Sequence, residues 1–315
     1  MLAIRVESSH ERGMGHLFRA CVLADALRES GRTVKLFLAD HAPGIEQAQR
    51  RGLAYSVVTA QGPEVDWETS AIANDKIKIW INDMHRTDRR ATLRVKAAGI
   101  PVVTLDDRGS GAADSDLHIA ALILDPREKP AGHRVLQGTE YLILNPEIAR
   151  HRRQRSSGAR WIVTLGGADT HCTTPKVLRL LSRHGRGATV IVGPAYAHDA
   201  ELAAAATGDF VIKRNVRSLI EEFGAHDVAV TGGGITPFEA NASGLPCIVV
   251  ANEDFEEPVG RELARLGGAV YAGHHSAIDE AVFGCPPLVA DMSAAALASV
   301  TLEGARRVIE EIAAL

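Results

Sequence analysis

A histidine follows a glycine-rich turn near the start of the chain. The turn, Gly13-Met14-Gly15-His16, comes after an apolar run typical of a strand and before residues 17–28, whose apolar side chains recur at helical spacing. Two glycines let the backbone turn tightly, and their amides together with a helix N-terminus can bind an anion. The positive helix end disfavours an imidazolium, so we expect a neutral His16 that can accept a proton from water or an alcohol. A structural role, in which His16 caps the helix, fits its position equally well.

The same turn could belong to a dinucleotide-binding fold. Asp40 follows the second expected strand, where an acidic residue could bind the ribose of NAD. The NAD fingerprint requires a third glycine, however, and Phe18 stands in its place. We therefore favour an anion site over an NAD site and expect no cofactor.

Two more glycine turns follow expected strands in the second half of the chain. They are Gly166-Gly167 and Gly232-Gly233-Gly234, the latter just before Thr236-Pro237, where a helix can begin. Three consecutive glycines leave amides available for a diphosphate. Glu239 falls in the first turn of that helix, where a carboxylate either complements the helix dipole or accepts hydrogen bonds from ribose hydroxyls. The spacing alone does not separate these two roles.

The elements that position these residues alternate between strand and helix along most of the chain. This order predicts an α/β fold with parallel sheets covered by helices. A polar, basic stretch, Pro146–Gly158, interrupts the alternation, and we interpret it as a solvated helix end and linker rather than as an anion site. We therefore expect Rossmann-like domains over residues 1–148 and 158–315, with the linker at 149–157. Two such domains facing each other would leave a cleft between the carboxyl ends of their strands.

Composition excludes several classes of function. The 315 residues include 35 Lys and Arg against 39 Asp and Glu, a net charge of −4, and aromatic residues make up only 4%. This balance argues against a nucleic-acid partner, which would require many phosphate contacts. No apolar run is long enough to span a membrane, and no signal peptide is evident. We expect a cytoplasmic protein whose oligomeric state the sequence does not indicate.

The spacing of the cysteines and acidic residues indicates no metal site. The four cysteines lie far apart and form no C-x-x-C pair, so we expect reduced thiols. They are Cys21, Cys172, Cys247 and Cys285. Asp106-Asp107 could hold Mg²⁺ through carboxylates, but a loop role is the favoured interpretation.

The N-terminal motif resembles that of a known enzyme family. Gly13-x-Gly15-His16-x-x-Arg19, followed by Leu-Ala-Asp-Ala-Leu, is similar to the start of the hydrolases that remove UDP from a trideoxy-altrose nucleotide sugar in pseudaminic acid biosynthesis, a family with related spore-coat polysaccharide proteins. Further segments fit in the same order: Trp80–Asp83, Thr104–Asp107, Glu140–Leu144, Leu165–Asp169, Gly232–Glu239 and Ala242–Pro246. The resemblance implies a glycosyltransferase-B fold, similar to that of the enzyme that adds GlcNAc to lipid I.

The resemblance also implies residue roles. His16 would activate water against the anomeric carbon, with Asp83 near the sugar. Phosphate and diphosphate would contact the glycine turns, Thr236 and Arg19, and the ribose would contact Glu239. Neither a metal nor a cofactor is implied, and the expected partner is a nucleotide sugar, most simply a UDP-sugar.

Three positions depart from the family pattern. Met84-His85 replaces a His-Tyr pair, so His85 would stand in for an active-site tyrosine. The segment Asn252–Glu257 replaces an Asn-Gln pair and carries four carboxylates, although Asn252 remains a candidate substrate-binding residue. Glu7 stands where the family commonly has Asp.

These observations favour a nucleotide-sugar hydrolase that releases a nucleoside diphosphate from a deoxy amino sugar. Two alternatives remain open: an inverting glycosyltransferase on the same scaffold and a non-catalytic nucleotide-sugar-binding protein. The fold does not separate them, because hydrolysis and transfer differ only in what occupies the water position.

Overall fold

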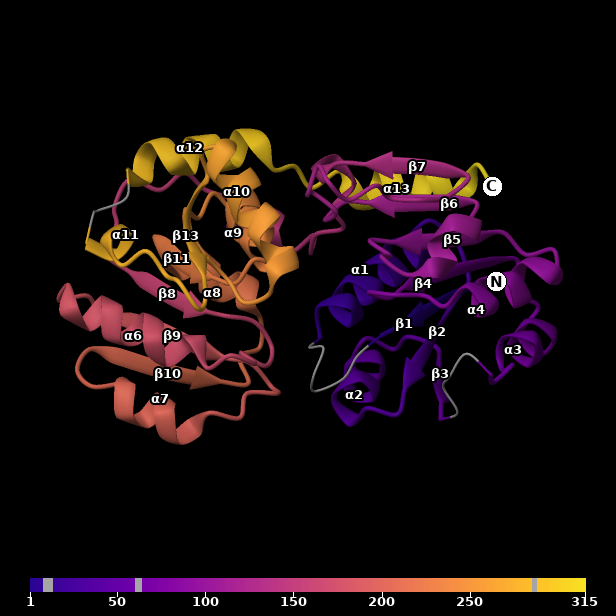
Figure 1. Ribbon diagram of the computed structural model, residues 1–315, viewed down its shortest axis with the longest axis horizontal. Coiled ribbons are helices and arrows are strands. Elements are labelled where there is room, and N and C mark those ends of the chain that lie inside the picture. The colour runs from indigo at the N-terminus through magenta and orange to yellow at the C-terminus, as the bar shows by residue number, and fades with distance from the viewer. Residues whose placement is uncertain (8–13, 60–63, 285–287) are drawn as a thin grey trace. The chain divides into compact units, whose positions relative to one another are not determined.

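The chain folds into two compact α/β units. The computed structural model describes residues 1–7, 14–59, 64–284 and 288–315. One unit comprises Met1–Ile143 with Glu303–Leu315, and the other comprises Leu144–Leu302. Each unit is built on one parallel sheet, with helices along the connections between strands (Figure 1). The predicted pair of Rossmann-like domains is confirmed.

The first unit has a seven-stranded sheet in the order β3-β2-β1-β4-β5-β6-β7. Its strands are β1 (Leu2–Val6), β2 (Val34–Ala39), β3 (Tyr55–Val58), β4 (Ile79–Asp83), β5 (Val102–Leu105), β6 (Leu117–Ala120) and β7 (Arg134–Gln137). Its helices are α1 (Gly15–Glu29), α2 (Ala42–Arg50), α3 (Glu68–Asp75), α4 (Arg89–Ala97) and α13 (Gly304–Ala313). The central strands β1, β4 and β5 are buried almost throughout, as expected for a sheet covered on both faces.

The C-terminal helix α13 lies outside the domain to which the sequence analysis assigned it. Its buried side chains Val308 and Ile312 belong to the core of the first unit, and Glu311 forms an ion pair with Arg134 of β7. The ribbon of α13 lies beside β6 and β7 (Figure 1). The amphipathic pattern of this helix requires an apolar surface, and both domains offer one. The sequence therefore could not decide which domain it covers.

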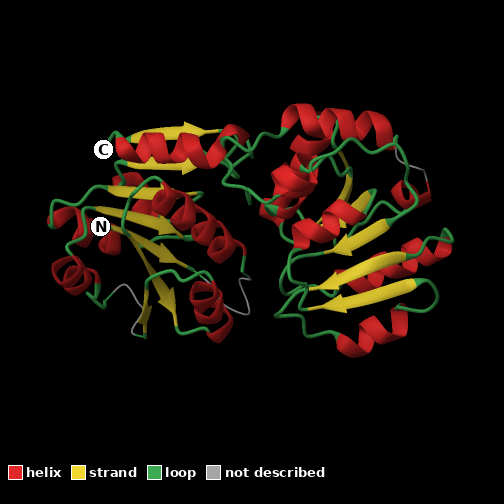
Figure 2. Cartoon of the chain, turned by 180° about the vertical axis from the view of Figure 1, so that it is seen from behind, coloured by secondary structure: helices red, strands yellow, loops and turns green. Residues whose placement is uncertain are grey.

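The second unit has a six-stranded parallel sheet in the order β10-β9-β8-β11-β12-β13. Helices and loops connect its strands (Figure 2). Its strands are β8 (Trp161–Thr164), β9 (Ala188–Val192), β10 (Phe210–Arg214), β11 (Val228–Thr231), β12 (Cys247–Ala251) and β13 (Ala269–His274). Its helices are α5 (Ile148–His151), α6 (Thr173–Arg183), α7 (Asp199–Ala205), α8 (Leu219–Ala225), α9 (Thr236–Ala242), α10 (Glu257–Arg265), α11 (Ala281–Gly284) and α12 (Val289–Ser299), and a 3-10 turn, η3, spans Asp254–Glu256.

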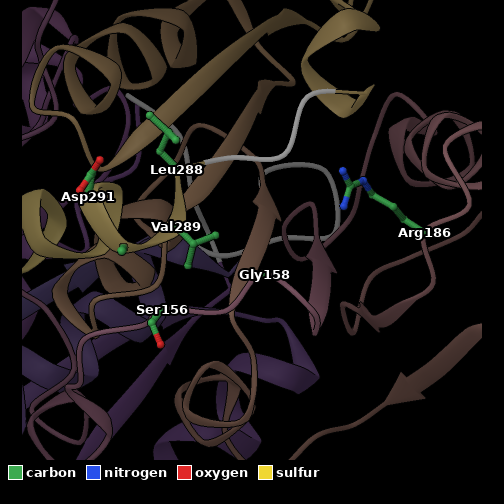
Figure 3. Close-up of a pocket in the computed structure, with 7 residues that line it drawn as sticks. Ser156, Gly158, Arg186, Leu288, Val289 and Asp291 are labelled. Carbon is green, nitrogen blue, oxygen red and sulfur yellow. The ribbon is translucent and has the colours of Figure 1, made fainter.

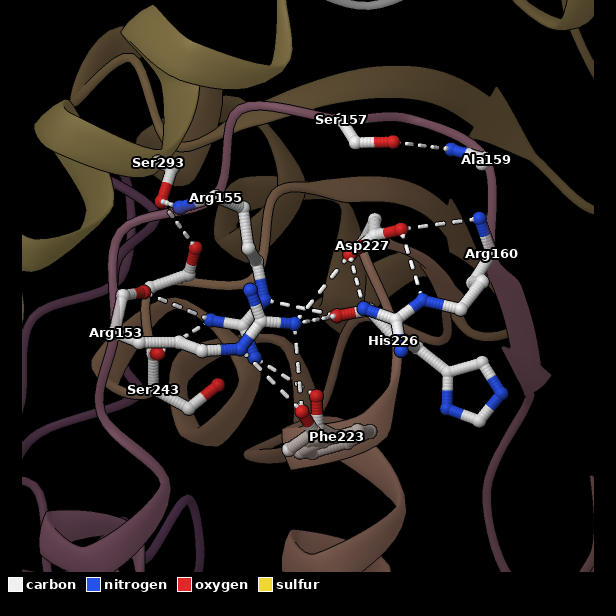
Figure 4. Close-up of polar contacts among 12 residues, drawn as sticks. Arg153, Arg155, Ser157, Ala159, Arg160, Phe223, His226, Asp227, Ser243 and Ser293 are labelled. Carbon is white, nitrogen blue, oxygen red and sulfur yellow. Dashed lines mark hydrogen bonds and ion pairs between the residues drawn. The ribbon is translucent and has the colours of Figure 1, made fainter.

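One arginine of the basic stretch that was expected to be a solvated linker is buried in the second unit. Arg155 is 0% exposed, and its guanidinium donates hydrogen bonds to the carbonyls of Phe223, His226, Arg153 and Ser243 (Figure 4). Several of these carbonyls stand at helix ends, where the backbone lacks partners within the helix. The guanidinium of Arg155 therefore supplies hydrogen-bond donors to carbonyls at helix C-termini. The expectation of a solvated stretch was wrong for this residue.

No helix in the described part of the chain is both long enough and apolar enough to cross a membrane.

Candidate active site

His16 lies at the carboxyl edge of the first sheet, beside a buried aspartate. It is the second residue of α1, and Asp83 is the last residue of β4, the strand that pairs with β1. Nδ1 of His16 is 2.7 Å from Oδ1 of Asp83, which is 0% exposed, whereas His16 is partly exposed. The structure thus brings together two of the three residues predicted to be catalytic.

The distances determine which nitrogen of His16 holds the proton. Nδ1 also lies 3.3 Å from Nη2 of Arg19, but the contact with the Asp83 carboxylate is shorter. A carboxylate can only accept, so Nδ1 donates to Asp83 and the lone pair of a neutral ring lies on Nε2. This is the arrangement by which a carboxylate orients a histidine base.

Arg19 holds Asp83 from the other side. Its Nε lies 3.1 Å from Oδ2 of Asp83, its Nη2 contacts Oδ1, and its Nη1 pairs with Asp106. Burial opposes the charge on Asp83, but Arg19 and His16 outweigh it and hold the pKa of the carboxyl below its usual range. Arg19 was expected to contact substrate phosphate, yet its guanidinium is buried and each of its three nitrogens contacts a carboxylate.

His85 lies on the loop that follows β4. Its backbone amide donates to Oε2 of Glu7 at 3.0 Å. Burial, followed by the charges of Arg108 and His16, lowers the pKa of the half-buried imidazole. The two imidazoles are therefore close enough to interact electrostatically. The lowered pKa favours the neutral form of His85.

The two aspartates after β5 accept hydrogen bonds from backbone amides of nearby loops. Asp106 takes the positive-φ conformation and accepts from the Leu122 amide at 2.6 Å as well as from Arg19. Asp107 accepts from the amides of Thr87 and Gly109 at 2.9 and 2.7 Å. The favoured loop interpretation agrees with these contacts. The role of Asp106 as a second partner of Arg19 carries no sequence signal.

The triple-glycine turn of the second unit already contacts a carboxylate. Oε2 of Glu256 accepts from the amides of Gly233 and Asn252 at 3.1 and 2.8 Å. A Cβ on Gly233 would lie 2.6 Å from Cβ of Glu256, whereas one on Gly234 would meet nothing closer than 3.8 Å. Close packing against Glu256 therefore explains why position 233 is a glycine. The space beside Gly234 is not filled by a described residue. Glu256, one of the four carboxylates in the segment Asn252–Glu257, thus stabilises the glycine turn.

The remaining candidates of the second unit lie at the same edge of its sheet. Gly166 has a φ of +92°, which explains glycine there. Asn252 is buried and ties two loops together, since its Nδ2 donates to the Leu165 carbonyl and its Oδ1 accepts from Thr173. The carbonyl of Gly167 accepts from the Ala195 amide. Gly15 begins α1 of the first unit, where an added Cβ would meet none of the described residues within 4 Å, and Gly13 lies outside the described residues.

Glu239 lies in the first turn of α9, which begins at Thr236. Desolvation of its carboxyl raises the pKa of Glu239 to about 7, an effect that the nearby Asn145 amide partly offsets. A carboxyl of this kind can either accept or donate a hydrogen bond near neutral pH.

A surface pocket of about 460 Å³ lies elsewhere in the second unit, near Ser156, Arg186, Leu288 and Asp291 (Figure 3). None of the residues expected to act in catalysis or substrate binding lines it, although Ser156 and Gly158 belong to the basic stretch discussed above.

No family model matches this chain. The chain is 21% identical over 291 residues to the spore coat polysaccharide biosynthesis protein SpsG of Bacillus subtilis, covering 86% of this chain and 83% of that protein. Its structure is similar to that of MurG from Acinetobacter baumannii, with a TM-score of 0.67, 14% identity, and coverage of 100% of this chain and 99% of that one. It is also similar to spinosyn rhamnosyltransferase SpnG in complex with thymidine diphosphate, with a TM-score of 0.62, 17% identity, and coverage of 98% and 99%. These likenesses establish the two-domain glycosyltransferase-B fold.

Proposed function

We propose that this chain is an inverting glycosyltransferase that uses a nucleotide-activated sugar, with His16 as its base. The observation that supports this most directly is the 2.7 Å contact between Nδ1 of His16 and the buried Asp83 carboxylate, which leaves Nε2 able to accept a proton. SpnG, which has the same fold, is named a rhamnosyltransferase. That likeness supports transfer over the hydrolysis that the sequence analysis favoured.

In the proposed reaction, Nε2 of His16 takes the proton of an acceptor hydroxyl. The oxygen attacks the anomeric carbon from the face opposite the nucleotide, the bond to the diphosphate oxygen breaks, and the nucleoside diphosphate leaves with the electron pair. Asp83 stabilises the imidazolium that forms, without itself taking the proton. Arg19 acts as a positioning residue, because it holds the Asp83 carboxylate on two sides.

In this proposal the second unit binds the nucleotide. The amides near Gly234 and the N-terminus of α9 would stabilise the diphosphate as negative charge grows on the leaving group. Glu239, in the same turn of α9, would contact the ribose. The thymidine diphosphate in the SpnG complex supports a nucleoside diphosphate as the ligand class.

Hydrolysis is the second candidate, supported by the resemblance of the motif from Gly13 to Arg19 to nucleotide-sugar hydrolases. Water would then take the place of the acceptor hydroxyl. No other change in the residues is required.

Phosphorus NMR of the purified chain with UDP-, CMP- and dTDP-sugars tests both candidates. We expect nucleoside diphosphate to appear only when a panel of hydroxyl acceptors is added, and His16→Gln to remove this turnover. Release without an acceptor would favour hydrolysis. Absence of both turnover and nucleoside diphosphate binding would overturn the proposal in either form.

A further inference from the structure

Three side chains with metal-binding atoms converge in the second unit. They are Cys172, His198 and Glu201, and their ligand atoms all lie within 4.8 Å of one another. None of the three belongs to the residues assigned to catalysis or nucleotide binding above. Sequence spacing did not reveal the group, because the cysteine and the histidine lie on different loops.

Two neighbouring loops at the carboxyl edge of the sheet bring the group together. Cys172 ends the loop after β8, where the Asp169 carboxylate accepts from the amides of Thr173 and Thr174, both at 2.8 Å. His198 directly precedes α7, and Glu201 lies in the first turn of that helix, which follows the loop after β9. A hydrogen bond of 2.9 Å from the Ala195 amide to the Gly167 carbonyl joins the two loops. Both sides of the group are thus held by backbone contacts.

Among the described residues, no hydrogen bond or ion pair joins the thiol of Cys172, the ring of His198 or the carboxylate of Glu201 to another side chain or to the backbone. The His198 ring does contact the Tyr196 ring edge-on, with 5.5 Å between their centroids. The neighbouring His171 differs, since its Nε2 is 3.0 Å from Glu253 and its ring stacks on His275. The three converging groups therefore remain available to a ligand.

We propose that Cys172, His198 and Glu201 form a binding site for a divalent transition metal, with Zn²⁺ as its natural occupant. Thiolate, imidazole and carboxylate are the ligand types that Zn²⁺ takes in proteins. The thiolate and the carboxylate together carry two negative charges, which balance the charge of the ion.

The observed separations suit this ion after small side-chain movements. Zn–S and Zn–N distances of about 2.3 and 2.0 Å place the ligand atoms of a tetrahedral site about 3.3–3.6 Å apart. Separations up to 4.8 Å can close to that range by rotation of exposed or half-buried side chains. Three protein ligands leave a fourth position for water. The bound ion would cross-link the loops after β8 and β9.

Titration of the metal-free chain with Co²⁺ and Zn²⁺ tests the site. We expect one ion per chain by elemental analysis, and a near-ultraviolet thiolate-to-cobalt band that Zn²⁺ displaces. Cys172→Ser keeps the other three thiols yet should lose the band. His198→Ala and Glu201→Gln should each weaken binding at least about tenfold, since even outer-shell changes reach that size. The exposed His133, in the first unit, supplies the control His133→Ala, which should bind as the wild type does.

A second measurement needs no variant. We expect saturating Zn²⁺ to protect Cys172 from alkylation, as mapped by mass spectrometry of the intact wild-type chain. A wild-type chain that binds neither ion at micromolar concentration, a cobalt band that survives Cys172→Ser, or alkylation of Cys172 unaffected by Zn²⁺ would each overturn the proposal.

Discussion

Nδ1 of His16 donates to Oδ1 of Asp83 across 2.7 Å, and the carboxylate that receives this bond is completely buried. The buried acceptor selects one tautomer of the histidine, because a carboxylate without its proton can only accept. The reactive lone pair of the neutral ring therefore lies on Nε2, on a side chain that remains partly exposed.

Asp83→Asn should reduce turnover of the proposed reaction by about 10²–10⁴-fold, because an amide can donate to Nδ1 and so favour the wrong tautomer. Nucleoside diphosphate affinity should stay within about twofold of the wild type. Steady-state kinetics together with calorimetric titration separate the two effects. The control is Asp25→Asn, a partly exposed residue of α1, the helix that carries His16. Equal kcat in Asp83→Asn and the control would mean that the histidine does not depend on its carboxylate.

Arg19→Met should lower the free energy of unfolding by about 3–5 kcal/mol, because Asp83 and Asp106 would both lose a buried cationic partner. Urea denaturation measures this change. Arg28→Met serves as the control, since Arg28 is half-exposed and its ion pair with Asp25 should contribute less than about 1 kcal/mol. Similar losses in both variants would contradict the buried-pair account.

Glu239→Gln should become more stable relative to the wild type as the pH rises. The pKa of Glu239 is raised from 4.5 to about 7, so between these values the folded chain keeps a proton that the unfolded chain has lost. The wild type therefore loses stability across this window, by up to about 3 kcal/mol, and the loss is constant above it. Urea midpoints at pH 5 and pH 8 should diverge between the two proteins. The exposed substitution Glu280→Gln should follow the wild type at both pH values, and parallel profiles for Glu239→Gln would refute the prediction.

Gly233→Ala and Gly234→Ala should separate packing from ligand binding in the glycine turn. A Cβ at Gly233 would meet Cβ and the carbonyl oxygen of Glu256 at 2.6 and 2.7 Å, so we expect a loss of about 1–3 kcal/mol in stability. A Cβ at Gly234 meets nothing closer than 3.8 Å, so this variant should fold normally while its methyl group weakens nucleoside diphosphate binding. Thermal melts and calorimetry with UDP and dTDP measure both effects. If Gly234→Ala bound the nucleotide as tightly as the wild type, the diphosphate would have to bind elsewhere than at this turn.

Arg155→Lys should destabilise the second unit by about 2–5 kcal/mol, because one ammonium cannot reach all the carbonyls that the guanidinium contacts (Figure 4). Arg160→Lys is the matched control, since the side chain of Arg160 is 58% exposed and its pairing with Asp227 should contribute less than about 1 kcal/mol. Thermal unfolding of the two variants would show equal shifts if Arg155 were a solvated linker residue.

The sequence by itself determined the two α/β units and the carboxyl-edge position of the glycine turns. Strand and helix patterns are local, and a residue that follows a strand in a parallel sheet must lie at its carboxyl edge. His16 could be singled out because it follows a glycine turn at the start of an expected helix, whereas Asp83 was indicated only by the resemblance to the hydrolase family.

Only the tertiary structure decided which side chains meet. Arg19 of α1 pairs with Asp106, 87 residues further along the chain. The Glu256 carboxylate accepts from the Gly233 amide, and Arg155 is buried although its neighbours in the sequence are polar. A local pattern records how polar a segment is. It does not record which distant carbonyl or carboxylate compensates a charge once water has been removed, and that compensation depends on contacts between elements.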